Sequence, residues 1–121
     1  MSLPYRHIDL PRAGATLRAG IWGNGPRIVL ASHGITANHV TFKPIVDRLD
    51  AGDTLIAPDH RGRARSNGIA GPWGMQEHAE DLIALLDHLH IDRVDVLLGQ
   101  SMGGFVSAVA AARHPQRFGA L

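Results

Sequence analysis

Short apolar runs alternate along this chain with amphipathic stretches of helical period. Residues 28–31 form a nearly continuous aliphatic run, which is typical of a strand buried on both faces. Residues 16–22 alternate between apolar and polar side chains, as a strand with one covered face does. Between residues 76 and 89, apolar side chains recur at intervals of three and four positions, which predicts an amphipathic helix.

Extended along the chain, this pattern predicts two N-terminal strands followed by alternating strands and helices. We expect strands at residues 6–10, 16–22, 27–32, 54–57 and 94–98, and the start of a sixth at 118–121. We expect helices at residues 42–49, 76–89 and 102–113. Such alternation favours an α/β fold with a mostly parallel sheet, here of about five strands plus the start of a sixth, with three helices.

Composition narrows the class of protein further. The 121 residues carry a formal net charge of +1, so neither nucleic acid nor an acidic membrane is an expected partner. The absence of cysteine excludes disulfides and thiolate chemistry. The N-terminus lacks the apolar core of a signal peptide and no run approaches membrane-spanning length, so a cytoplasmic protein is expected. The glycines and prolines are scattered rather than massed in a linker, which favours one domain over residues 1–121.

The strongest candidate for chemistry is the pentapeptide at residues 99–103. It has the form G-x-S-x-G, with Ser101 at its centre, and it follows an apolar run and precedes an alanine-rich one. A serine at a sharp strand-to-helix turn is held in a strained, left-handed conformation with its hydroxyl exposed. Its neighbours two positions away must be nearly free of side chains, which Gly99 and Gly103 provide. The pattern predicts a nucleophile elbow; the alternative is a strand-to-helix connection with an idle serine.

Two further motifs precede this elbow at the ends of predicted strands. They are His33-Gly34-Ile35-Thr36 and Asp59-His60-Arg61-Gly62-Arg63-Ala64-Arg65-Ser66. Together with the Ser101 elbow, in this order and spacing, they resemble the motifs of the α/β-hydrolase family, and the resemblance covers the whole chain. It is closest to the bacterial esterase-like and haloperoxidase-like serine hydrolases. The resemblance implies the N-terminal half of that fold. One departure is Ala64, where the family usually has glycine.

The resemblance also implies roles for individual residues. Ser101 would attack a carbonyl carbon and form an acyl-enzyme. The backbone N–H groups of Met102 and Ile35 would stabilise the oxyanion that forms. His33 and Gly34 would support that loop, His33 through hydrogen bonds rather than through contact with substrate. No cofactor and no metal ion is implied.

Other polar residues near these motifs receive plainer interpretations. Asp59 ends a predicted strand and is expected to brace its loop rather than to act as the catalytic acid. Arg61, Arg63 and Arg65 are expected to form a solvated turn, because no aromatic residues are interleaved with them. His60 is not expected to form a dyad with Asp59, since neighbours on an extended segment point to opposite sides.

The catalytic acid and histidine that the resemblance requires are not expected in this chain. The family order is serine, acid, histidine, so both partners would lie beyond residue 121, and none of the eight histidines stands at a matching position. The domain would then be partial, ending before the acid and histidine segments and any cap. Its fifth strand would expose an apolar, unpaired edge that favours association.

Three functions remain open at this stage. The first is a serine hydrolase acting on a small ester or related acyl compound when complete, with the isolated chain inactive. The second is a non-catalytic module that associates through its open edge, as a homo-oligomer or with a missing C-terminal half. The third is cofactor-free haloperoxidase or perhydrolase chemistry at the same serine. Epoxide hydrolase and haloalkane dehalogenase activities are disfavoured, because those relatives carry aspartate where this chain has Ser101.

Overall fold

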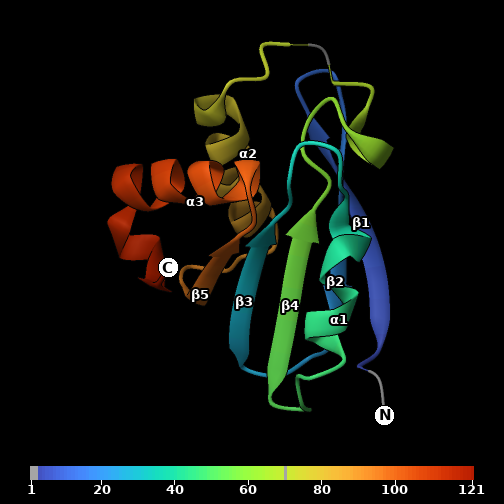
Figure 1. Cartoon of the computed structure of the whole chain (residues 1–121), viewed down its shortest axis with the longest axis vertical. Helices are drawn as coiled ribbons and strands as arrows, with labels where there is room; N and C mark the ends of the chain where they lie inside the picture. The colour runs from blue at the N-terminus through green and yellow to red at the C-terminus, as the bar shows by residue number, and fades with distance from the viewer. Residues whose placement is uncertain (1–2, 70) are drawn as a thin grey trace.

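The computed structural model describes residues 3–69 and 71–121, which form a six-stranded sheet with helices on both faces (Figure 1). The strands are β1 (Tyr5–Arg12), β2 (Ala15–Trp22), β3 (Arg27–Ser32), β4 (Asp53–Pro58), β5 (Val94–Gly99) and β6 (Phe118–Ala120). The helices are α1 (Lys43–Val46), α2 (Met75–His88) and α3 (Met102–Arg113), with short 3₁₀ turns η1 (His39–Phe42), η2 (Ala64–Ser66) and η3 (Pro115–Arg117). The α/β architecture and the three helices are as the sequence predicts.

The strands lie in the order β1-β2-β4-β3-β5-β6. β1 and β2 form an antiparallel hairpin, and β2 is antiparallel to β4. β4, β3, β5 and β6 run parallel to one another, which confirms the mostly parallel sheet. Because parallel strands end at one edge of a sheet, the loops after β3, β4 and β5 are gathered there, and these loops carry the three motifs.

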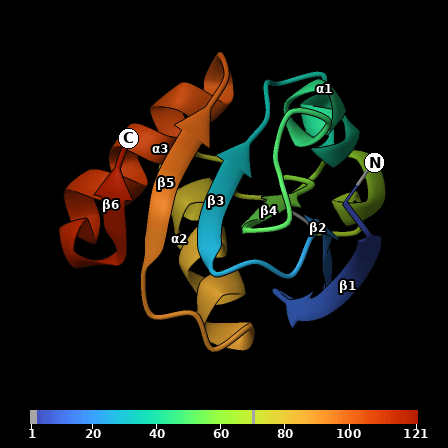
Figure 2. The same ribbon diagram turned by 90° about the horizontal axis from the view of Figure 1, so that it is seen from below.

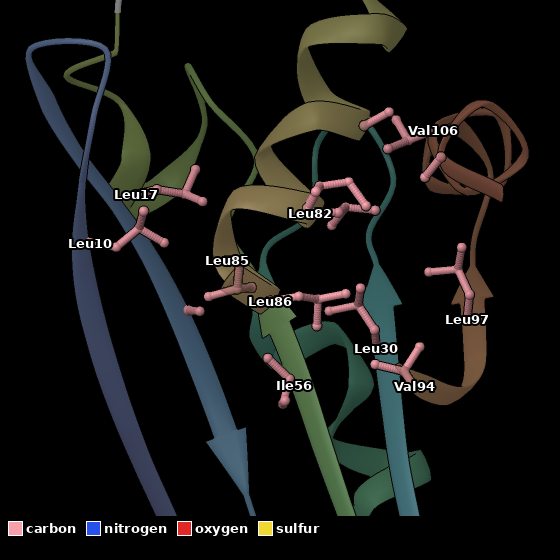
Figure 3. Close-up of a cluster of buried hydrophobic side chains, with 14 of the residues drawn as sticks. Leu10, Leu17, Leu30, Ile56, Leu82, Leu85, Leu86, Val94, Leu97 and Val106 are labelled. Carbon is pink, nitrogen blue, oxygen red and sulfur yellow. The ribbon is translucent and has the colours of Figure 1, made fainter. Parts of the chain in front are cut away.

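Side chains that alternate along the strands separate two hydrophobic clusters. Leu30 of β3 and Ile56 of β4 point toward α2 and α3, where they pack with Leu82, Leu86 and other buried residues (Figure 3). The neighbouring positions on the strands point to the other face, where η1 and α1 cover them with Phe42 and Val46. Figure 2 shows α1 over the β4 side of the sheet, well separated from β5 and β6. The sheet is thus sandwiched, and its central strands are buried as the apolar runs predict.

The element bounds differ from the sequence prediction by more than one residue in two places. The helix expected at residues 42–49 is a 3₁₀ turn followed by the single helical turn of α1, and the Asn38 side chain caps the 3₁₀ turn by accepting from the Val40 N–H at 2.8 Å. β1 continues through Pro11 to Arg12, two residues beyond the predicted end of this strand. Proline lacks the N–H that a central strand must donate, and β1 lies at the edge of the sheet.

The expectation that β5 presents an unpaired edge is wrong. β6 pairs with β5 in parallel, with Val94 opposite Phe118 and Val96 opposite Ala120. The strands β1 and β6 are therefore the edges of the described sheet.

Candidate active site

Ser101 stands on a strained turn between β5 and α3. Its backbone has φ +55° and ψ −120°, a conformation that L-residues rarely adopt and that costs about 1–3 kcal/mol. The residue is exposed, and its side chain does not cap the helix that follows. The backbone therefore presents the hydroxyl to solvent at the carboxyl edge of the sheet without a hydrogen bond to the helix N-terminus.

The two flanking glycines are required by close packing of the turn. A Cβ built on Gly103 would overlap the carbonyl oxygen of Ser32 at the end of β3. A Cβ built on Gly99 would overlap the carbonyl oxygen of Gly103. The N–H of Gln100 also donates to the Ser32 carbonyl at 3.1 Å, which holds the turn against β3. The elbow predicted from G-x-S-x-G is therefore a close approach of three backbone segments.

The loop after β3 lies beside the serine. A Cβ built on Gly34 would be 3.5 Å from the Cβ of Ser101, so these two residues are in contact distance. Met102 is the first residue of α3, where backbone N–H groups have no partner within the helix and the helix dipole favours an anion. The structure thus brings Gly34 and Met102 next to Ser101.

His33 is buried beneath this loop as a neutral ring with a fixed tautomer. Its Nε2 accepts from the N–H of His60 at 2.9 Å, so the ring proton lies on Nδ1, which donates to the Gly34 carbonyl at 2.5 Å. Burial lowers the pKa of His33 below its usual value, although the Gly34 carbonyl opposes this. Because a trans peptide is planar, fixing the Gly34 carbonyl also fixes the opposite direction of the Ile35 N–H.

A column of buried histidines continues behind His33, which the sequence analysis did not anticipate. The rings of His33 and His60 lie 4.4 Å apart, and those of His60 and His78 lie 4.9 Å apart. His60 shares a hydrogen bond of 2.6 Å with the Ser32 hydroxyl. Burial lowers the pKa of His60 to about 2 and that of His78 to about 4, so both rings are neutral at physiological pH. The sequence signal was the place of His78, four positions before Leu82 on the apolar face of α2.

Asp59 braces its loop, as expected from its place at the end of β4. Its Oδ1 accepts from the backbone N–H and from Nδ1 of His39, each at 2.7 Å, and its Oδ2 accepts from the Arg65 N–H at 3.3 Å. Burial raises the pKa of this carboxyl, but the hydrogen bonds from His39 outweigh burial and hold it below its usual value. Asp59 does not pair with His60, which bonds to Ser32 instead.

The expectation of a solvated turn is wrong for Arg61. This residue is 6% exposed and forms a two-pronged ion pair with the buried Asp81 of α2, at 2.7 and 2.8 Å. Arg12 of β1 reaches the same carboxylate at 2.8 Å. Arg65 is exposed and Arg63 is half-buried, so one arginine of the three matches the prediction in full. Burial of a guanidinium requires a carboxylate partner, and that partner lies twenty residues away in sequence.

The backbone conformation at Ala64 accounts for the glycine that the family usually has at this position of the second motif. Its φ is +46°, in the left-handed region that glycine adopts without strain.

Over residues 3–69 and 71–121 the structure shows no cluster of three or more His, Cys, Asp or Glu suited to a metal ion. Within the same ranges, each helix is too short or too polar to cross a membrane.

Comparison with known proteins finds similarity to hydrolases. The chain is 34% identical over 110 residues to a 2-(acetamidomethylene)succinate hydrolase of Mesorhizobium japonicum, covering 91% of this chain and 38% of the relative. It is 30% identical over 89 residues to a 3-hydroxybutyrate-oligomer hydrolase of Cupriavidus necator, covering 70% of this chain and 30% of the relative. A crystal structure of a hydrolase from Pseudomonas aeruginosa superposes with a TM-score of 0.83 at 25% identity, covering 93% of this chain and 43% of that one.

This chain therefore spans less than half the length of each of these proteins. Its sheet and helices match the N-terminal portion of the fold that they share. Residues 27–121, which include the three motifs, match the family model of the alpha/beta hydrolase fold. The chain belongs to the alpha/beta hydrolase fold family.

Proposed function

We propose that Ser101 is the nucleophile of an acyl-transfer hydrolase. The observation that carries the proposal is the strained backbone of Ser101, with an exposed hydroxyl at the first turn of α3. Strain of this kind persists only where the surrounding structure enforces it, and it gathers at sites of function. Here the enforcement comes from the glycine contacts with Ser32 and Gly103.

The reaction begins with attack of the Ser101 hydroxyl oxygen on a carbonyl carbon. The negative charge that develops on the carbonyl oxygen is stabilised by the N–H groups of Met102 and Ile35, the second oriented through the His33–Gly34 hydrogen bond. Loss of one such donor costs roughly 3 kcal/mol of transition-state stabilisation. The leaving group departs, an acyl-serine remains, and water hydrolyses it.

Activation of the hydroxyl requires a histidine and a carboxylate, and residues 3–69 and 71–121 show no hydrogen bond from such a pair to Ser101. Among the described residues, the hydrogen bonds of His33, His39 and His60 all lead to partners other than this serine. We infer that the base and its acid belong to segments outside these 121 residues. The chain alone then retains the oxyanion donors without the base, and its turnover of esters is expected to stay close to background.

The substrate class that we propose is a small ester or related acyl compound. The two relatives are named as hydrolases of 2-(acetamidomethylene)succinate and of 3-hydroxybutyrate oligomers, and both names favour cleavage at a carboxyl derivative. Serine rather than aspartate at the elbow supports the same chemistry, since an acyl-serine is the intermediate of such hydrolysis.

A labelling experiment on the chain tests the role of Ser101. The protein is treated with an alkyl fluorophosphonate, digested with trypsin, and mapped by fragmentation of the peptide of residues 94–113. We expect slow label at Ser101 and at no other serine of this peptide, because the oxyanion donors remain. Ser101→Ala should lose the label, and Ser107→Ala, which removes a buried hydroxyl, should keep it. Equal labelling of several serines in the folded chain would refute the proposal.

A further inference from the structure

Apart from Ser101, the structure contains a hydroxyl, an imidazole and a carboxylate that are joined by hydrogen bonds: those of Tyr5, His39 and Asp59. Tyr5 lies on β1, at the opposite side of the sheet from β5 and Ser101. The Tyr5 hydroxyl lies 2.9 Å from Nε2 of His39, and Nδ1 of His39 lies 2.7 Å from Oδ1 of Asp59. Because the pKa of Asp59 is lowered, its carboxylate accepts, and the His39 proton lies on Nδ1. Nε2 is then an acceptor, and Tyr5 donates its hydroxyl hydrogen to it.

The imidazole of this series is held in place by its surroundings. His39 is 7% exposed, and its ring lies against β2 at Gly20, where a Cβ would overlap ring atom Cδ2. The ring of Tyr5 is stacked on it with an interplanar angle of 4°. Asp59 also accepts the backbone N–H of His39, which fixes both ends of the residue. A base held by a carboxylate next to a hydroxyl is the arrangement that activates hydroxyl nucleophiles.

Tyr5, which carries the hydroxyl, lines a cavity. Tyr5 is 49% exposed and lines a cavity of about 350 Å³ together with Trp22, Val40 and Lys43. The Trp22 ring lies 5.0 Å from that of Tyr5 and forms an apolar wall. Lys43 lines the same cavity, and its ammonium group is paired with the carboxylate of Asp47. The volume and the lining suit a small apolar acyl group.

We propose that Tyr5, with His39 as its base and Asp59 as the group that orients the base, is a second acyl-acceptor site. The phenol oxygen attacks the carbonyl carbon of an activated ester, and its proton passes to Nε2 of His39. The carbon–oxygen bond to the leaving group then breaks, and the leaving alkoxide or phenolate takes that proton from His39. The products are an O-acyl tyrosine and a free alcohol or phenol, with no change of oxidation state.

General-base assistance is needed because the phenol is protonated at rest. Burial raises the pKa of Tyr5, and Arg18 opposes this shift. The site shares no residue with the serine elbow. Tyr5 lies on the edge strand β1, whereas Ser101 follows β5, with β2, β4 and β3 in between (Figures 1 and 2). The two nucleophiles therefore lie in different parts of the sheet and can be tested independently.

Acetylation by p-nitrophenyl acetate tests this site, because Tyr5 is the single tyrosine of the sequence. Trypsin places Tyr5 in the peptide of residues 1–6 and Ser101 in that of residues 94–113. Hydroxylamine removes an acetyl group from a phenol ester and leaves an acetylated amine, which separates Tyr5 from the N-terminus. We expect acetylation of Tyr5 about 100-fold faster than that of free N-acetyltyrosine amide under the same conditions. A rate equal to that of the free amino acid would overturn the proposal.

Two matched variants test whether His39 acts as a base toward Tyr5 or is only a neighbouring ring. His39→Gln keeps a donor toward Asp59 but has no basic nitrogen, and it should slow acetylation of Tyr5 by 30-fold or more. His7→Gln removes an exposed histidine 6.5 Å from Tyr5 that makes no hydrogen bond to it, and it should leave the rate unchanged. Thermal unfolding confirms that each variant is folded. Should His39→Gln unfold, the comparison of the wild-type chain with free tyrosine decides the matter.

The serine site provides the remaining control. Ser101→Ala should leave acetylation of Tyr5 unchanged, and Tyr5→Phe should leave fluorophosphonate labelling of Ser101 unchanged. An acetylation rate at Tyr5 that falls with Ser101→Ala would mean that acyl groups reach Tyr5 from the serine, and it would overturn the assignment of His39 as the base. Unchanged acetylation in folded His39→Gln would overturn it as well.

Discussion

The serine elbow and the Tyr5–His39–Asp59 series present a hydroxyl in opposite ways. Ser101 is exposed on a strained backbone, and its side chain does not bond to the helix that it precedes. Tyr5 lies on a regular edge strand, and its hydroxyl is bonded to an imidazole that a buried carboxylate orients. The elbow exposes a hydroxyl on a strained backbone at the start of a helix, whereas the Tyr5 hydroxyl is bonded to an imidazole on an unstrained backbone. If both proposals hold, exposure of a nucleophile and its activation by a base are separate features, and each region has one of them.

The largest effect is expected from filling the space beneath the elbow. In Gly103→Val the new side chain would overlap the backbone carbonyl groups of Ser32 and His33. We therefore expect the free energy of unfolding to fall by about 3 kcal/mol or more. Chemical denaturation measures it. The matched control is Gly104→Ala, whose Cβ would meet only the Gly99 oxygen at 3.9 Å and which should be neutral or stabilising. Equal effects of both substitutions would show that the elbow is not closely packed.

The next largest effect is the loss of folding stability in acid, where the buried histidines behind the elbow and the Asp59 carboxylate respond in different pH ranges. His60 and His78 have pKa values of about 2 and about 4 in the folded chain, against about 6.5 when unfolded. The unfolded chain therefore binds more protons below pH 6.5, so stability is complete above that pH and falls as the pH drops toward 4 and then 2. Between pH 6 and pH 5 we expect a loss of about 2 kcal/mol from the pair.

The carboxylate of the tyrosine region responds in a lower range. The pKa of Asp59 is lowered, so its contribution is present above pH 4 and is lost only as the pH falls through the folded value. Urea denaturation at pH 7, 6 and 5 measures the effect of the buried histidines, to which His33, whose pKa is also lowered, contributes. His78→Leu, which puts an apolar side chain in the same buried place, should reduce that dependence by removing the share of His78. A pH dependence that His78→Leu leaves unchanged would place the titrating groups elsewhere.

The smallest effect concerns the strain at the serine itself. Ser101→Gly should raise the free energy of unfolding by about 1 kcal/mol, because glycine adopts a positive φ without strain. Ser101→Ala removes the same hydroxyl but keeps the Cβ, so it should leave stability nearly unchanged. Thermal unfolding of the two variants isolates the backbone contribution. A destabilised Ser101→Gly would mean that the elbow is relaxed, and the contrast with Tyr5 would lose its basis.

Local features of this chain were predictable from the sequence, and features of long range were not. The elbow could be predicted because Gly99, Ser101 and Gly103 lie within five residues and because backbone sterics alone define the turn. The prediction that Arg61 lies in a solvated turn was wrong, because its partner Asp81 lies on another element, α2. Without a known partner, a charged residue is expected to be exposed. The expected open edge of β5 failed for a similar reason, because three residues after a turn were enough to pair with it.

The sequence by itself determined the alternation of strands and helices, the family and the place of the serine. Hydrophobic period and glycine spacing encode these features over a few residues, and burial enforces them. Only the tertiary structure decided that His33, His60 and His78 form one buried column and that Tyr5, His39 and Asp59 are linked. The members that contact each other directly are 18 to 34 residues apart in sequence. The packing of β1, the η1 turn and the end of β4 brings the second group together. A hydrogen bond depends on the distance between two side chains in space, and local sequence pattern does not specify that distance.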